Sequence, residues 1–396
     1  MKKIVSLLIA FAIMQTAKAD EGMWLPYLIG KNYDDMVRKG LVLSAEDLYA
    51  ANHSSLKDAI VQFNGGCTGE IISNSGLLLT NHHCGYDAIA TLSTVEKNYL
   101  DNGFWALSKE QELPAVGVSV LFLESMEDVT ATVQKTINGL SGEALTKALA
   151  GLRKDMETKA NEGGKFYTTL KEYFNGNQYI LIKYKKYNDV RLVGTPPKSL
   201  GKFGGDTDNW MWPRHTGDFS MFRVYGDKNG NPAEYSADNL PLQPKQHLKV
   251  NIGGVKENDF AMILGYPGRT NRWMPAASIE QNVKFAYPAW VEGAKTGMDG
   301  MKKYMDQSDA LNLVYASKYA STANYWKNRQ GMIDALTKFG TSKTKAAQEA
   351  KFNAWANKPA NKAKYGNVVT TINKYYGMTN EKSRHDNYLQ QLFRTT

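Results

Sequence analysis

The chain has 396 residues, two cysteines and a formal net charge of +9. This length allows about two domains with a substantial core. The charge is uneven, because residues 271–396 hold 19 Lys and Arg against 9 Asp and Glu. The lysines are scattered along expected helix faces, so we expect a solvated surface and no nucleic-acid partner.

The first 19 residues have the three parts of a secretory signal. Lys2 and Lys3 give a basic start, residues 4–14 are apolar, and residues 17–19 form a small-x-small cleavage site. We therefore predict a signal peptide over residues 1–19 and an exported mature chain. No apolar run approaches the length needed to cross a bilayer, so we expect no membrane insertion.

Short strands dominate the sequence from about residue 22 to residue 268. The expected strands are residues 70–73, 77–81, 118–122, 179–187, 189–193, 219–225, 247–252 and 260–264. They do not alternate with helices, which favours a barrel or a sandwich over a parallel sheet. One helix is expected among them, because Leu145, Leu149 and Leu152 recur at helical spacing.

The character of the sequence changes near residue 271. Beyond it, Ala, Lys, Met and aromatic residues are frequent, and we expect helices over residues 276–290, 304–339 and 345–376. We therefore predict a mixed β and α fold. Its β-rich region is residues 20–270, with a helical insertion near 141–175, and its α-helical region is residues 271–396.

The two cysteines flank a predicted hairpin. Cys67 precedes its first strand and Cys84 follows its second. In an oxidising compartment, two cysteines on neighbouring strands most simply form a disulfide. A zinc site made of both cysteines with His82 and His83 is an alternative, but adjacent residues of a strand point to opposite faces. We expect neither a metal nor an organic cofactor.

His83 is the candidate general base, and His82 is expected to face away from it. A histidine base needs a carboxylate on its far ring nitrogen, which fixes the tautomer. In chymotrypsin-like peptidases this acid follows the histidine in the chain. Asp206 and Asp208 lie in a turn-like loop, whereas Asp218 opens a predicted buried strand. We therefore favour Asp218.

No serine has the context expected of an activated nucleophile. Such a serine needs backbone N–H donors for the oxyanion, which usually means flanking glycines. The later serines lack them: Ser236, Ser278, Ser308, Ser317, Ser321 and Ser383. Ser342 and Lys345 fit a Ser-x-x-Lys pattern, but its companion motifs are missing.

Several longer motifs are spread along nearly the whole chain. They are residues 21–26 (EGMWLP), 63–69 (FNGGCTG), 78–86 (LLTNHHCGY), 209–220 (NWMWPRHTGDFS), 315–319 (YASKY) and 324–327 (NYWK). In these motifs the sequence resembles peptidase family S46, the bacterial exported dipeptidyl-peptidases of the 7 and 11 group. The resemblance implies a periplasmic or cell-surface serine peptidase that releases dipeptides from the free N-terminus of oligopeptides.

The resemblance also implies roles for single residues. His83 corresponds to the general base and Asp218 to its orienting carboxylate. Asn209, Trp210 and Asn324 correspond to the residues that fix the N-terminus of the substrate. The implied architecture is a double chymotrypsin-like β-barrel with a helical domain inserted between its halves and covering the cleft.

The motifs match only the first barrel and part of the helical cap of that architecture. The family's nucleophilic serine lies in the second barrel, so we expect this chain to lack the serine half and to show no turnover unless a second polypeptide supplies it. The alternatives are a catalytically inactive peptide-binding remnant and a truncated gene product.

Overall fold

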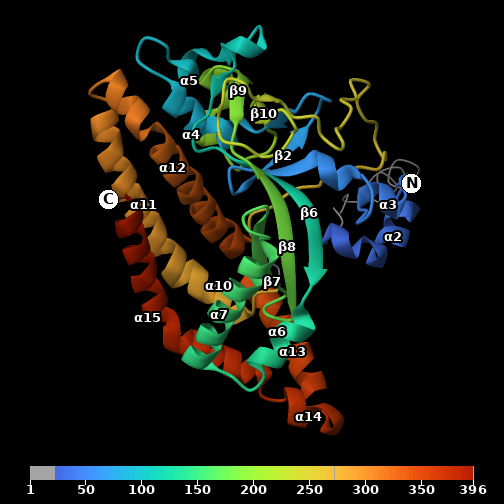
Figure 1. The fold of residues 1–396 in the computed structure, drawn as a ribbon. Helices are drawn as coiled ribbons and strands as arrows, with labels where there is room; N and C mark the ends of the chain where they lie inside the picture. The colour runs from blue at the N-terminus through green and yellow to red at the C-terminus, as the bar shows by residue number, and fades with distance from the viewer. Residues whose placement is uncertain (1–22, 272, 396) are drawn as a thin grey trace, which may run out of the picture. The chain divides into compact units, whose positions relative to one another are not determined.

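The computed structural model describes residues 23–271 and 273–395 (Figure 1). The predicted signal peptide, residues 1–19, lies outside the described residues. The chain divides into two compact units. The smaller unit contains the chain up to residue 57 together with residues 253–262, and the larger contains residues 58–252 together with the chain from residue 263 onward.

The smaller unit is built from short helices: η1 (Pro26–Lys31), α2 (Tyr33–Arg38) and α3 (Ala45–Leu48). A capping box begins α3. The Ser44 hydroxyl accepts from the Asp47 N–H at 3.1 Å, and the Asp47 carboxylate accepts from the Ser44 N–H at 2.8 Å. Each side chain thus satisfies a backbone donor that has no partner within the helix.

The larger unit contains one antiparallel sheet of eleven strands. The strands are β1 (Ile60–Phe63), β2 (Cys67–Ile71), β3 (Leu77–Thr80), β4 (Phe104–Trp105), β5 (Leu113–Pro114), β6 (Val120–Asp128), β7 (Tyr167–Tyr173), β8 (Gln178–Tyr187), β9 (Val190–Thr195), β10 (Ser220–Gly226) and β11 (Leu240–Pro241). Their order is β4-β9-β10-β3-β2-β1-β6-β8-β7, with β5 on β9 and β11 on β10. Within the described ranges, β4 and β7 do not pair, so this path is open.

Two predicted strands, residues 247–252 and 260–264, are irregular in the structure. The apolar residues of 247–252 alternate and residues 260–264 are all apolar, but Val250 and Ile252 are 67% and 97% exposed. The Leu248 N–H donates to the Ile71 carbonyl oxygen at 2.8 Å, yet no ladder follows among the described residues. The prediction was wrong because an apolar pattern alone supplies no strand partner.

The sheet core lies against helix α4 (His82–Leu92). Phe63 of β1 and Phe222 of β10 are fully buried, with ring centroids 4.9 Å apart. A Cβ on Gly85 of α4 would lie 3.0 Å from the Phe222 ring and 2.7 Å from the Ser220 hydroxyl. Only glycine therefore allows the first turn of α4 to approach the sheet this closely.

Two helices, α6 (Thr130–Ile137) and α7 (Gly142–Ala160), are inserted between β6 and β7. The expected helix around Leu149 is present as α7. Residues 167–173, which we had placed in the helical insertion, form strand β7 instead, and Leu170 of this strand packs in the same core cluster as Val133 of α6.

Helices make up the chain after residue 275. They are α10 (Ala276–Gln281), η4 (Asn282–Ala286), α11 (Tyr287–Met305), α12 (Asp309–Lys338), α13 (Thr341–Ala356), α14 (Pro359–Tyr365) and α15 (Val368–Thr395). Helix α11 packs against α12 and α15 (Figure 1). Among the described residues, no helix is both long and apolar enough to cross a membrane.

Helix α12 contacts both the C-terminal helices and the sheet region of the larger unit. It packs against α11 and also against α4, and Ala316 is buried in the core of the sheet. The sheet and α12 thus share one core.

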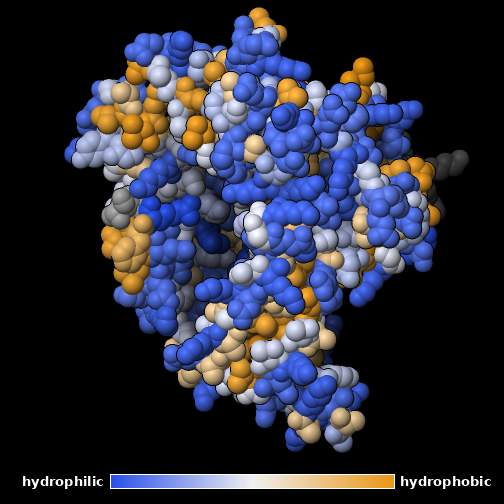
Figure 2. All heavy atoms as spheres, in the orientation of Figure 1, coloured by the Kyte–Doolittle hydropathy of each residue, from blue (hydrophilic) through white to orange (hydrophobic). Residues whose placement is uncertain are grey.

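Figure 2 shows a largely hydrophilic face on which the surface is hollowed between the C-terminal helices and the strands.

Candidate active site

His83 lies where strand β3 passes into helix α4. We predicted it at the end of a strand, but Asn81 is the N-cap and the helix begins at His82. Successive helical residues point about 100° apart. His82 consequently turns into the core, where it is 1% exposed, while the His83 side chain is 68% exposed. The two histidines do face apart, although through helical rather than strand geometry.

Asp218 holds His83 through two contacts. Its Oδ2 lies 2.7 Å from Nδ1 of His83, and its Oδ1 accepts from the His83 N–H at 3.0 Å. The Asn81 side-chain amide donates to Oδ2 at 3.3 Å. An ionised carboxylate can only accept a hydrogen bond. The contact between Oδ2 of Asp218 and Nδ1 of His83 therefore places the proton of the neutral ring on Nδ1 and leaves the lone pair on Nε2.

The pKa of Asp218 lies below its ordinary value. Burial of the carboxyl opposes ionisation, but hydrogen bonds and the charge of His83 outweigh it. Asp218 is therefore a carboxylate at neutral pH, as a partner of an imidazole requires. The other candidate acids are engaged elsewhere: Asp206 forms a 3.0 Å ion pair with Lys202, and Asp208 packs against Gly204.

Burial lowers the pKa of His82 to about 4, so this side chain is neutral at pH 7. Its ring packs edge-to-face against Tyr86, and a Cβ on Gly201 would collide with it. The buried His82 ring thus packs the first turn of α4 into the core. Because Gly201 has no side chain, the backbone at this position can lie directly against the ring.

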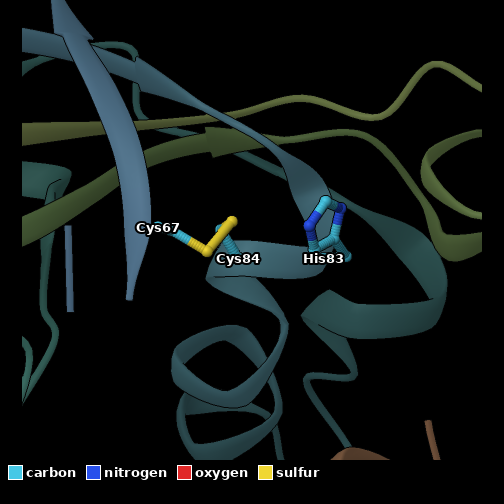
Figure 3. Close-up of side chains that lie close together, drawn as sticks. All are labelled: Cys67, His83 and Cys84. Carbon is cyan, nitrogen blue, oxygen red and sulfur yellow. A yellow bond between two sulfur atoms is a disulfide. The ribbon is translucent and has the colours of Figure 1, made fainter. Parts of the chain in front are cut away.

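The disulfide joins β2 to α4 (Figure 3). Cys67 and Cys84 are bonded, with Cα atoms 6.1 Å apart, and His83 precedes the second of them. Within the part of the chain that the structure describes, these three residues are the one cluster of possible metal ligands. Disulfide sulfur atoms are not thiolates, so the cluster does not suit a metal in this state.

Asn209, Trp210 and Asn324 come together from two distant parts of the chain. The Asn209 amide donates to Oδ1 of Asn324 at 2.9 Å, and Nε1 of Trp210 donates to the Asn324 backbone oxygen at 3.0 Å. Asn209 and Trp210 follow helix α9 (Gly205–Asp208), and Asn324 lies on α12. The Trp210 side chain is 56% exposed. We name these three residues the amide cluster.

One connection links the amide cluster to the histidine. The loop between β9 and β10 carries both Asn209 and Asp218. Within it, the Thr216 hydroxyl donates to the Phe203 carbonyl oxygen at 3.0 Å, and the Gly217 N–H donates to the Leu200 carbonyl oxygen at 3.0 Å. The loop is therefore folded on itself between the two groups.

The chemistry of this arrangement is that of a base next to a polar binding surface. Nε2 of His83 can accept a proton, and Asp218 can stabilise the resulting imidazolium. Amide oxygens of Asn209 and Asn324 can accept from an ammonium. Among the described residues, no serine hydroxyl is hydrogen-bonded to the His83 ring.

Three residues of this region were not predicted from the sequence. Asn81 donates to Asp218, Arg214 donates to Oδ1 of Asn209 at 3.2 Å, and Lys327 contacts the backbone of α9. The spacing of Asn324 and Lys327, three residues apart on an expected helix, was a usable signal, because such residues share a face.

Comparisons with known proteins agree on one family. The model of the family Peptidase S46 matches residues 19–396. "Dipeptidyl-peptidase 7" of Capnocytophaga gingivalis is 53% identical over 399 residues, which cover 100% of this chain and 56% of that protein. "Asp/Glu-specific dipeptidyl-peptidase" of Flavobacterium psychrophilum is 44% identical over 94% of this chain and 53% of its own length.

Solved structures are similar over the same extent. The crystal structure of Porphyromonas endodontalis DPP11 in complex with the dipeptide Arg-Glu superposes with a TM-score of 0.87 at 41% identity, covering 94% of this chain and 54% of that one. The chain spans about half the length of the relatives it matches. The match along nearly all of its residues shows that it belongs to peptidase family S46.

Proposed function

We propose that the chain is part of an exported serine-type dipeptidyl-peptidase that releases dipeptides from the free N-terminus of oligopeptides. The observation that carries the proposal is the 2.7 Å contact between Nδ1 of His83 and Asp218, which leaves Nε2 open. In this role Nε2 of His83 takes the proton of the attacking serine, and the Asp218 carboxylate stabilises the imidazolium.

The amide cluster is the proposed site for the amino terminus of the peptide. Asn209 and Asn324 offer carbonyl oxygens to the ammonium, and the exposed Trp210 ring offers an aromatic wall beside it. Solved relatives bound to Arg-Glu and Arg-Asp dipeptides support peptides as the ligand class. A fixed distance from this cluster to His83 would set the length of the released fragment at two residues.

The nucleophilic serine is proposed to come from a polypeptide segment outside these 396 residues. The serines of this sequence lack flanking glycine pairs, and none is hydrogen-bonded to His83 in the described part. In this proposal residues 20–270, whose strands form an open path among the described residues, correspond to the first chymotrypsin-like barrel, and residues 271–396 form part of a helical cap. The antiparallel hairpins and the order histidine before aspartate support it.

Export is proposed on two grounds. Residues 1–19 have the pattern of a secretory signal, and the bonded pair Cys67 and Cys84 suits an oxidising compartment. Periplasm or cell surface of a bacterium is the proposed location.

A complementation assay tests the catalytic proposal. The purified chain alone is expected to release no coumarin from dipeptidyl-aminomethylcoumarin substrates. Mixing it with the unmatched C-terminal part of the Capnocytophaga gingivalis relative is expected to produce release. His83→Ala should abolish that release, and Asp218→Asn should reduce it by about 10²–10⁴-fold. Release by the chain alone that His83→Ala abolishes would contradict the missing-serine proposal.

Calorimetry separates this function from the second candidate, a catalytically inactive peptide-binding protein. The intact amide cluster without a bonded serine is the observation that favours the second candidate. Both predict that trialanine binds more tightly than N-acetyl-trialanine, and only the peptidase proposal predicts release in the complemented mixture. Equal binding of both peptides would contradict the two together.

A further inference from the structure

Lys327 reaches from helix α12 to the loop that carries the amide cluster. Its Nζ donates to the Asp206 carbonyl oxygen at 2.6 Å and also to the Thr207 carbonyl oxygen. These oxygens lie near the C-terminal end of helix α9, where carbonyl groups have no partner within the helix. A lysine ammonium at that position supplies the missing donors.

The contacts of Lys327 are directed at backbone and not at an acid. Among the residues that the structure describes, no carboxylate forms an ion pair with it, although Asp206 is close in sequence and pairs with Lys202 instead. A role through donated hydrogen bonds, rather than through charge, follows from this arrangement. Arginine, which also carries donors at the end of a flexible side chain, is consequently the conservative replacement.

The segment held by Lys327 has a backbone that needs outside support. Gly204 and Gly205 have φ values of 78° and 55°, which glycine adopts freely. Trp210 has a φ of 61°, and a bulky residue in this left-handed region is strained. Such a conformation persists when the surroundings fix it, and hydrogen bonds with α12 are part of those surroundings.

Four hydrogen bonds from two residues of α12 fix the segment. Lys327 holds its helical turn, and Asn324 accepts from Asn209 and from the Trp210 ring. The two α12 residues are three positions apart and therefore share one helix face. Lys327 contacts the helical turn at Asp206 and Thr207, and Asn324 contacts the two residues that follow the turn, Asn209 and Trp210.

We propose that Lys327 is a positioning residue for recognition of the peptide amino terminus. By binding carbonyl groups at the end of α9, Lys327 fixes the direction in which the backbone continues from this helix into Asn209 and Trp210. The amide and the indole are thereby presented in one conformation before a peptide arrives. This inference rests on the proposed function of the amide cluster and adds a residue that touches no substrate.

Hydrogen–deuterium exchange of the chain without peptide tests the structural part. The Gly205, Asp208 and Met211 amides donate to backbone oxygens within the segment and report on its stability. Lys327→Met is expected to speed their exchange at least 10-fold, and Lys327→Arg to restore most of the protection. Lys318→Met is the matched control, because it lies nine residues earlier and so on the opposite face of α12.

Calorimetry on the same four proteins tests the recognition part. The wild-type chain and Lys318→Met are expected to favour trialanine over N-acetyl-trialanine by the same factor, Lys327→Met to lower that factor about 10-fold, and Lys327→Arg to regain it. A wild-type chain without any preference overturns the proposed function itself. A wild-type preference that Lys327→Met retains, or unchanged exchange in Lys327→Met, overturns the positioning role alone.

Discussion

The histidine and the amide cluster are held by different means, although one loop connects them. His83 lies on a helix that is bonded covalently to β2 and packed on buried phenylalanine rings. The amide cluster depends on polar contacts between a left-handed loop segment and α12, more than 100 residues apart in sequence. The base is therefore fixed by the core, whereas the binding surface is fixed by a few hydrogen bonds. Substitutions near the base should mainly lower the free energy of unfolding, and substitutions in the amide cluster should mainly weaken peptide binding.

The largest effect is expected from removing core support beneath α4. Phe222→Ala deletes a fully buried ring that packs on Phe63 and Gly85. A loss of about 3–5 kcal/mol in the free energy of unfolding is expected, measured by urea denaturation. Phe339→Ala, at an exposed position, should change it by less than about 0.5 kcal/mol. Equal effects of both would contradict the assignment of the core.

Removing the disulfide should come next. Cys67→Ser combined with Cys84→Ser opens a loop with a sequence separation of 17, for which a loss of about 3 kcal/mol is expected. Reducing agent should lower the stability of the wild-type chain by a similar amount and leave the double variant unchanged. A response of the double variant to the reductant would contradict this explanation.

The buried His82 predicts an acid-sensitive core. Its folded-state pKa of about 4 lies below the ordinary value of 6.5, so the unfolded chain binds the proton first. The contribution of His82 to stability is complete above about pH 6.5 and is lost as the pH falls toward 4, by about 3 kcal/mol. His82→Leu should flatten the dependence on pH, whereas Ile89→Val should lower stability by about 1 kcal/mol at every pH. Parallel curves for wild type and His82→Leu would contradict the assignment.

The smallest effect is expected in the amide cluster. Trp210→Phe keeps an aromatic ring but removes the donor to the Asn324 backbone oxygen. Stability should fall by about 1 kcal/mol or less, the usual range for one hydrogen bond. Calorimetry should nevertheless show weaker trialanine binding, by about 5-fold. A loss of stability as large as that of Phe222→Ala would remove the contrast between the two regions.

The sequence predicted local features of the site better than long-range ones. The hairpin before Cys84 could be inferred, because turn residues and alternation are local signals. Asp218 lies 135 residues from His83, and it was favoured for its place at the start of a predicted strand and for the chain order of chymotrypsin-like peptidases. The start of a helix at His82 was missed, although the apolar run of Leu77–Leu79 ends at Thr80 and Asn81. Asn81 is a common N-cap residue, but it was read as the last residue of a strand.

The amide cluster was reached by resemblance alone. Nothing in the loop around Asn209 or in the helix around Asn324 indicates that the two meet, because hydrogen bonds between distant segments leave no periodic signal. The irregular segments at residues 247–252 and 260–264 show the opposite failure: their pattern is a strand pattern, and tertiary context overrides it.

Ala316 anchors helix α12 in the core of the sheet. Asn324 lies eight residues beyond it, about 12 Å along the axis, whereas Lys338 at the end of the helix lies about 33 Å away. A rigid tilt about Ala316 would displace Lys338 nearly three times as far as Asn324. A small change in the tilt of α12 at this anchor would therefore alter the position of Lys338 far more than that of Asn324.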